Sequence, residues 1–168
     1  DLRWHPALPH PHIPYIGPAL VGLITDAKTR KPVSLHQTWI NADGTKPSVL
    51  RKEKKARMLL GKHAIAGGVI RLWPDEDVTH GLGIAEGVET ALSLAHAFQP
   101  VWALIDGGQL GKFAPLPGIE SLTIACDNDP AGITGARACA ALWDAAGVEV
   151  FITRQQENDL NDLLMEAA

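Results

Sequence analysis

The spacing of hydrophobic and polar positions differs between the two halves of the chain. In the first half, apolar-rich runs at 19–25 and 33–40 flank a polar turn at 26–32, which predicts an antiparallel hairpin. A third run at 65–73 predicts one more strand of the same kind. Residues 1–17 are rich in Pro and His, so we expect an extended arm or loop there.

From about residue 77 onward, strand-like and helix-like segments alternate. The predicted strands are 82–86, 101–105, 121–126 and 148–153, and the predicted helices are 88–98, 131–146 and 160–167. Such alternation is typical of parallel βαβ units. We therefore predict an α/β fold. An open, mainly parallel sheet flanked by helices over 77–168 follows a small, basic α+β subdomain with antiparallel strands over 1–76.

Composition is typical of a folded chain outside membranes. Hydrophobic residues make up 46% of the 168 residues, enough for a packed core. No apolar run reaches the roughly 18 residues of a membrane span. The two cysteines give no disulfide framework, so we expect a cytoplasmic protein. Because the chain starts at Asp1, we expect a fragment of a longer protein.

Charge is divided unevenly between the two halves. Residues 1–80 hold 12 Lys and Arg against 7 Asp and Glu, a net charge of +5, and residues 81–168 hold 3 against 12, a net charge of −9. This division suits a protein that holds a polyanion with one part and a metal ion with the other.

Acidic residues follow three of the predicted strands. Glu86 ends the predicted strand 82–86, and Asp127 and Asp129 follow the apolar run 122–126. Asp159 follows the last strand. In an open α/β sheet, chemistry collects at the carboxyl ends of the strands. Clustered carboxylates need a partner, and a hard divalent cation suits them, so we predict a Mg²⁺ site, with Mn²⁺ as a substitute.

Simple structural explanations compete with this interpretation. Asp129 precedes Pro130, as a helix N-cap would, and Asp159 and Asp162 open the last predicted helix. Glu89 falls in the first turn of a helix, where acids are favourable. Capping fits Glu86 poorly, because it ends a strand inside the sheet.

Basic residues of the first half are candidates for phosphate binding. The set comprises Arg51, Lys52, Lys54, Lys55, Arg57 and Arg71, joined by Lys112 from the second half. A solvated charged face is the alternative explanation. Gly108 to Lys112 hints at a P-loop, but Asp106 stands where its first Gly belongs and Phe113 replaces the Ser or Thr.

As a set, these acidic motifs resemble a known family. Glu86-Gly87-x-Glu89, Asp127-x-Asp129-x-Ala131-Gly132 and Asp159-Leu160-Asn161-Asp162-Leu163 are similar to the motifs of the Toprim domain, which primases, topoisomerases and some nucleases share. The resemblance covers about residues 80–168. Within that family it is closest to bacterial-type primases and primase-helicases of phages, plasmids and integrated elements. It implies a Toprim-like open parallel sheet.

The resemblance also implies roles for the acids. Glu86 would act as general acid or base or would assist a metal ion. Asp127 and Asp129 would hold Mg²⁺, and Asp159 would assist a second ion. Glu89 and Asp162 would be secondary acids. Asn161 stands where primases often have a third acid, and Glu89 where they commonly carry an Asp, two departures from the family pattern.

The function implied is RNA primer synthesis on single-stranded DNA from nucleoside triphosphates, in mobile-element replication. Helicase and zinc-binding modules would belong to a longer parent protein. A Toprim metal-dependent nuclease and a non-catalytic DNA-binding fragment are the alternatives. A haloacid-dehalogenase-like phosphatase also uses Asp-x-Asp after a strand, but needs Thr or Val where this chain has Ala131.

Overall fold

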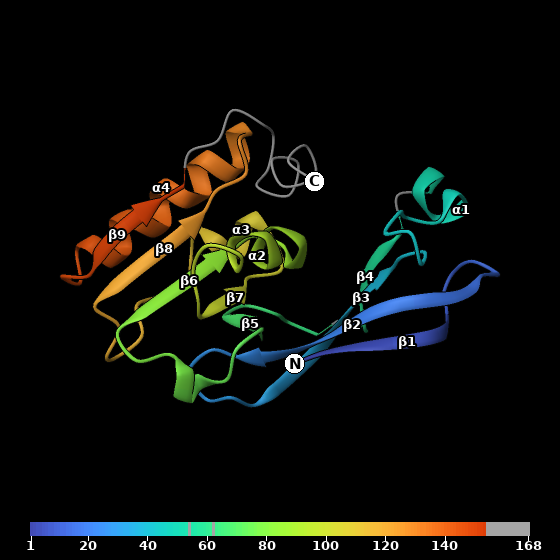
Figure 1. The fold of residues 1–168 in the computed structure, drawn as a ribbon, viewed down its shortest axis with the longest axis horizontal. Coiled ribbons are helices and arrows are strands. Elements are labelled where there is room, and N and C mark those ends of the chain that lie inside the picture. Colours follow the sequence, from blue (N-terminus) through green and yellow to red (C-terminus); the bar gives the residue numbers. More distant parts are fainter. Residues whose placement is uncertain (54, 62, 154–168) are drawn as a thin grey trace.

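A single sheet runs through the described part of the molecule (Figure 1). The computed structural model describes residues 1–53, 55–61 and 63–153, so the predicted helix at 160–167 lies outside the described residues. The strands are β1 (Leu2–Pro9), β2 (Ile16–Asp26), β3 (Pro32–Trp39), β4 (Arg57–Leu59), β5 (Gly68–Arg71), β6 (Gly81–Ala85), β7 (Val101–Ala103), β8 (Ser121–Ala125) and β9 (Glu149–Ile152). Their order is β4-β3-β2-β5-β7-β6-β8-β9, with β1 paired to β2.

Within these described ranges, the helices are short except for one. They are α1 (Ser48–Lys52), α2 (Val88–Leu94), α3 (Gly107–Leu110) and α4 (Pro130–Asp144), with a 3-10 turn η1 (Asp75–Asp77). Asp129 caps α4 and Pro130 occupies its first turn, and the chain leaves the helix through Gly147 at φ 81°. The predicted helix 131–146 is confirmed, whereas α1, α3 and β4 were not predicted.

The predicted division into antiparallel and parallel strands is confirmed. β2 and β3 form the predicted antiparallel hairpin. β6 pairs in parallel with both β7 and β8, and β8 also pairs in parallel with β9. The sheet is continuous because β5 pairs antiparallel with both β2 and β7. The boundary between residues 76 and 77 stays a prediction. We call residues 1–76 the N-terminal part and residues 77–168 the C-terminal part.

The Pro-rich start of the chain is more ordered than an arm or loop. Leu2–Pro9 forms β1, an antiparallel partner of β2, and its register shifts between His5 and Leu8. Pro6 lies at this irregularity and Pro9 at the strand end. These are the positions where a strand outside the centre of a sheet tolerates a residue without an N–H.

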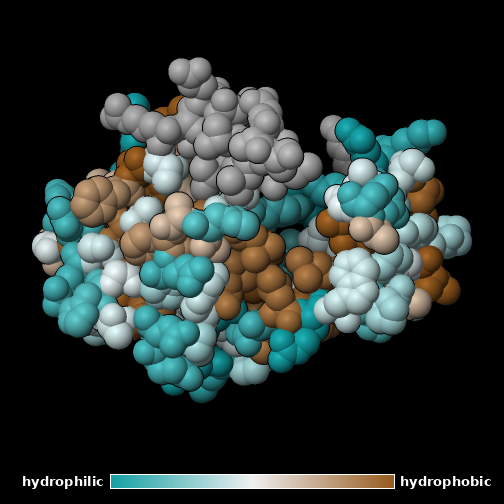
Figure 2. Space-filling model, in the orientation of Figure 1, coloured by the Kyte–Doolittle hydropathy of each residue, from teal (hydrophilic) through white to brown (hydrophobic). Residues whose placement is uncertain are grey.

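Side chains alternate between the two faces of the parallel strands, and both faces are covered. Leu82, Ile84, Leu122 and Ile124 belong to a core beneath α3 and α4. On the opposite face, buried residues of α2 pack with Ile24 and Ile70 of the N-terminal part, so the two parts share this second core. In the space-filling view, hydrophobic side chains gather where the two parts meet (Figure 2).

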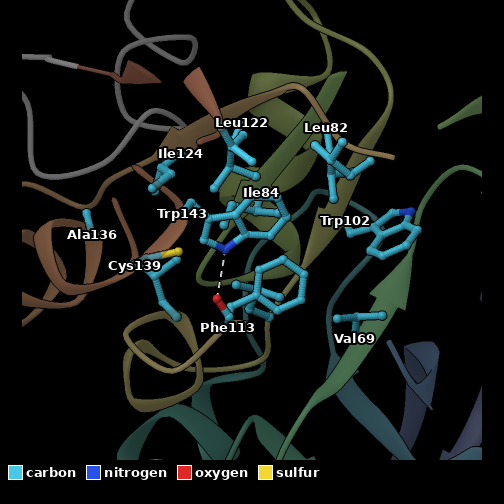
Figure 3. Packing of buried hydrophobic residues seen from close by; sticks show 14 of the residues in the cluster. Val69, Leu82, Ile84, Trp102, Phe113, Leu122, Ile124, Ala136, Cys139 and Trp143 are labelled. Atoms are coloured by element: carbon cyan, nitrogen blue, oxygen red, sulfur yellow. Dashed lines mark hydrogen bonds between the residues drawn. The ribbon is translucent and has the colours of Figure 1, made fainter. Parts of the chain in front are cut away.

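Trp143 of α4 anchors the first core (Figure 3). It is fully buried, its indole N–H donates to the carbonyl of Phe113 at 2.8 Å, and the two rings stack at 5.6 Å. This contact fixes α4, and with it the loop that carries the acids after β8, against the sheet.

Trp143→Ala should therefore destabilise the protein strongly. Truncation of a buried Trp removes its packing and leaves a buried carbonyl without its donor, which together cost about 3–5 kcal/mol in the free energy of unfolding. Urea denaturation measures this loss. Leu142→Ala, at a neighbouring position of α4 with 46% exposure, is the matched control and should change the unfolding free energy by less than about 1 kcal/mol. A similar change in both variants would contradict the anchoring role of Trp143.

Candidate active site

Parallel pairing brings three strand ends to one edge of the sheet. Ala85 of β6 is level with Ala103 of β7 and with Ala125 of β8. The arrowheads of these strands point the same way in Figure 1. Glu86 therefore leaves the sheet close to the point where Asp127 leaves it, as the strand-end pattern predicts.

Glu86 lies in a negative environment. Burial is the largest cause that raises its pKa, and the charges of Asp127, Asp129 and Asp106 raise it further, whereas the Gly107 backbone lowers it. The three predicted acids Glu86, Asp127 and Asp129 thus lie close enough to repel one another.

Two close approaches shape the space around these acids. A Cβ added at Gly107 would lie 2.9 Å from a carboxylate oxygen of Glu86, so a side chain there would push the acid away. A Cβ at Gly132 would lie 2.6 Å from the carbonyl oxygen of Asp127. Because Gly132 has no side chain, the start of α4 can pack directly on the loop that carries Asp127.

Asp127 is oriented by a neighbour on another element. The hydroxyl of Thr90 donates to Asp127 Oδ1 at 3.3 Å, and Thr90 is only 4% exposed. Thr90 belongs to the first turn of α2, three residues after the N-cap Gly87. The helix that follows β6 therefore aims the acid that follows β8.

Asp129 is both an acid of the cluster and a helix cap. Its Oδ1 accepts the Gly132 N–H at 2.7 Å, the bond expected of an N-cap. The residue is exposed. The competing capping interpretation of Asp129 is therefore correct in geometry, and it does not remove the charge that Asp129 adds near Glu86.

Asp106 is a further acid of this edge that sequence reasoning did not select. It follows β7, its Oδ1 accepts the Gln109 N–H at 2.9 Å, and its charge acts on Glu86. The signal was present, because Asp106 precedes Gly107 after an apolar run just as Glu86 precedes Gly87. Thr90 carried no comparable signal, since a Thr in a helix is unremarkable.

The remaining predicted acids divide into two groups. Asp159 and Asp162, like Lys54 among the basic residues, lie outside the described residues. Glu89 contacts two cations of the N-terminal part. Its Oε1 accepts from Arg57 Nη2 at 2.8 Å and lies 3.6 Å from Lys46 Nζ.

The carboxylates at the strand ends suit a divalent cation that is bound by only a few protein ligands. Among the described residues, no three His, Cys, Asp or Glu side chains are arranged to hold a metal together. Mg²⁺ is commonly bound by one or two carboxylates, its other positions being filled by water and substrate phosphates. Asp127, with Glu86 or Asp129, matches that requirement.

Most of the predicted basic residues are at the surface. Arg51 and Lys52 on α1 are exposed, as is Lys112 after α3, and Lys55 is 43% exposed by side chain. Arg57 is half exposed although it pairs with Glu89.

Arg71 is different, because the structure places it in the interior. Its side chain is 8% exposed and pairs with Asp75 at 2.5 Å. It also donates to Thr25 and to the carbonyl of Ala27, and its guanidinium lies 4.5 Å from the centre of the Trp102 ring. A buried cation with these partners serves the fold. We therefore leave Arg71 out of the phosphate-binding surface.

Comparison with known proteins agrees with the arrangement of strands and acids. Residues 81–168, just over half of the chain, match the Toprim domain. The chain belongs to the Toprim family. Residues 1–72 match a domain of unknown function, DUF7146. No curated protein matches the chain.

Two of the solved structures with a similar fold are described as primases. The primase fragment of the bacteriophage T7 primase-helicase aligns with a TM-score of 0.63 and 16% identity, over 89% of this chain and 59% of that one. The Aquifex aeolicus primase, with zinc-binding and RNA polymerase domains, aligns with a TM-score of 0.57 and 16% identity, over 95% and 40%.

A third similar structure is a complex. It contains the bacteriophage T7 lagging-strand DNA polymerase interacting with primase domains of two gp4 subunits, bound to an RNA/DNA hybrid and dTTP. It aligns with a TM-score of 0.59 and 15% identity, over 89% of this chain and 72% of that one. The Toprim protein thus spans less than two thirds of the T7 primase fragment and of the Aquifex primase. Within the part of the chain that the structure describes, no helix is both long and apolar enough to cross a membrane.

The raised pKa of Glu86 predicts a pH-dependent stability. Its carboxyl holds its proton more tightly in the folded state, so ionisation destabilises the fold as pH rises above the ordinary Glu range. Glu86→Gln should raise the Tm by roughly 2–4 °C at pH 7–8 without divalent ions, and the gain should vanish below about pH 4.

Circular dichroism melting at several pH values tests this. Glu149→Gln, which removes an exposed acid at the start of β9, is the matched control and should leave the Tm close to that of the wild type. A gain for Glu86→Gln that is the same at pH 4 and pH 8 would show that its charge is not the cause.

Proposed function

We propose that this Toprim protein is the catalytic core of a DNA primase, which joins ribonucleotides on a single-stranded DNA template with the help of Mg²⁺. The main support is the cluster of Glu86, Asp127 and Asp129 at the ends of neighbouring parallel strands. The Toprim family of the chain and the fold that it shares with solved primase structures also support this proposal.

Each acid has a task that its surroundings suit. Asp127, oriented by Thr90, and Asp129 would hold the ion, with Asp159 as a further ligand. Glu86 lies near Asp127 and Asp129 and would accept a proton from an attacking 3′-hydroxyl, a role that its raised pKa favours. When bound, Mg²⁺ supplies positive charge that stabilises the charge developing on phosphate oxygens.

Positive charge for the substrate comes mainly from the N-terminal part. We propose that Arg51, Lys52, Lys54, Lys55 and Arg57, with Lys112, contact phosphates of the template or of the nucleotide. Lys46 joins them, because it lies beside Arg57 at the same carboxylate. The net charge of +5 on residues 1–80 favours attraction of a polyanion over a neutral partner.

The parent protein and its setting are part of the proposal. One similar structure is a primase-helicase fragment and another contains a zinc-binding domain. We propose that helicase and zinc-binding modules accompany this core in a protein that acts in the cytoplasm during mobile-element replication.

Primer synthesis tests the proposal. Incubation with single-stranded DNA, labelled ribonucleotides and Mg²⁺ should give short RNA products, and Asp127→Asn should lower the rate by about 100-fold or more because a metal-binding charge is lost. Asp144→Asn, at the exposed end of α4, is the matched control and should retain the rate. Full activity in Asp127→Asn would remove Asp127 from the site.

The same reactions separate primase from nuclease. DNA cleavage without any extension would replace the proposed synthesis by hydrolysis on the same scaffold. Independently of activity, Mg²⁺ should raise the Tm of the wild type and not that of Asp127→Asn, because a ligand that binds only the folded state stabilises it. Equal Tm shifts in both proteins would contradict a metal site at Asp127.

A further inference from the structure

The first turn of α2 contacts both sides of the candidate active site. Thr90 reaches Asp127 on one side, and its neighbour Glu89 reaches Arg57 and Lys46 on the other. Consecutive Cα atoms are about 3.8 Å apart. One short stretch of backbone therefore sets the distance between an acid of the C-terminal part and two cations of the N-terminal part.

The two cations converge on a single oxygen of Glu89. Arg57 Nη2 lies 2.8 Å and Lys46 Nζ 3.6 Å from Glu89 Oε1. Arg57 comes from β4, and Lys46 from the segment between β3 and α1. The positive charges of Arg57 and Lys46 repel each other, and the Glu89 carboxylate between them offsets this repulsion.

Glu89 is suited to stay charged. Burial by itself would raise its pKa, but Arg57, its own backbone N–H, Lys46 and His36 lower it below the ordinary value. His36 lies on β3, and burial lowers its pKa. Glu89 with its two partners therefore leaves a net positive charge at this position.

The cations keep capacity for a further anion. Arg57 contacts Glu89 through Nη2, and half of the Arg57 side chain is exposed. The Lys46 side chain is 37% exposed. Their shared partner Glu89 lies beside the turn that carries Glu86. Glu89 Oε2 is 3.7 Å from the position that a Cβ of Gly87 would take, and Gly87 directly follows Glu86.

We propose that Glu89 is a positioning residue, which holds Arg57 and Lys46 at the edge of the acid cluster. A phosphate bound by these two cations would then lie within reach of Glu86 and Asp127. This rests on the proposed nucleotidyl transfer. Glu89 touches no substrate and acts through the cations. A simple ion-paired contact between the two parts is the competing explanation, and exposed pairs of that kind contribute little to stability.

The phosphate can belong to the nucleotide or to the DNA strand, and two measurements separate these sources. In primer synthesis, Glu89→Gln should raise the KM for ATP about tenfold and change kcat by less than about twofold if the nucleotide is held. If the cations hold the DNA strand instead, Glu89→Gln should bind a labelled single-stranded oligonucleotide more weakly, as measured by fluorescence anisotropy in buffer with EDTA. The slope of log K against log salt concentration should then fall in magnitude by about 0.7 per lost phosphate contact.

A double-mutant cycle shows whether Glu89 acts through Arg57. Arg57→Ala should reproduce the defect, and Glu89→Gln combined with Arg57→Ala should be no worse than Arg57→Ala alone. Glu89→Asp keeps the charge and should restore part of the lost function. Glu149→Gln is the matched control with the same loss of charge at a distant exposed strand.

The outcomes are distinct. Unchanged KM and unchanged oligonucleotide binding in both Glu89→Gln and Arg57→Ala would overturn the proposal, and so would fully additive effects. A lower Tm in Glu89→Gln with unchanged KM and salt slope would make Glu89 a structural contact only. If the wild type makes no primer, the EDTA arm still tests Glu89, so the positioning role and the primase function can fail separately.

Discussion

The candidate site depends above all on the parallel pairing of β6 between β7 and β8. This pairing places the carboxyl ends of three strands level with one another, so the residues that follow them have little freedom to separate. Because these residues include Glu86, Asp106 and Asp127, the fold brings like charges together at a half-buried edge. Burial, together with these neighbouring charges, raises the pKa of Glu86, and a bound cation would relieve the repulsion.

The N-terminal part completes this edge by continuing the same sheet. Through β5, its antiparallel strands join β7, and its apolar side chains share a core with α2. The helix that buries this core also presents Glu89 to Arg57 and Thr90 to Asp127. Packing and electrostatics are thus coupled, since a shift of α2 would move the acids and the cations relative to each other.

Prediction from sequence succeeded where a local pattern has one structural outcome. The alternation of apolar runs and helical segments predicted the parallel strands. Glu86 and Asp127 come after the ends of β6 and β8, as that pattern implies, and their roles stay predictions. Prediction failed where contacts join distant segments. Arg71 resembles any surface cation in sequence, yet Asp75, Thr25 and Trp102 bury it. Asp106, by contrast, has the same local pattern after an apolar run as Glu86, and Asp159 and Asp162 lie outside the described residues.

The sequence by itself determined the fold class, the separation of basic and acidic halves, and the acids at the strand ends, because hydrophobic period and strand-end position are local properties. Only the tertiary structure decided which charges meet. The Glu89–Arg57 pair joins residues 32 positions apart, and the Thr90–Asp127 bond joins residues 37 positions apart. Such partners depend on strand order and helix placement, which no local pattern encodes.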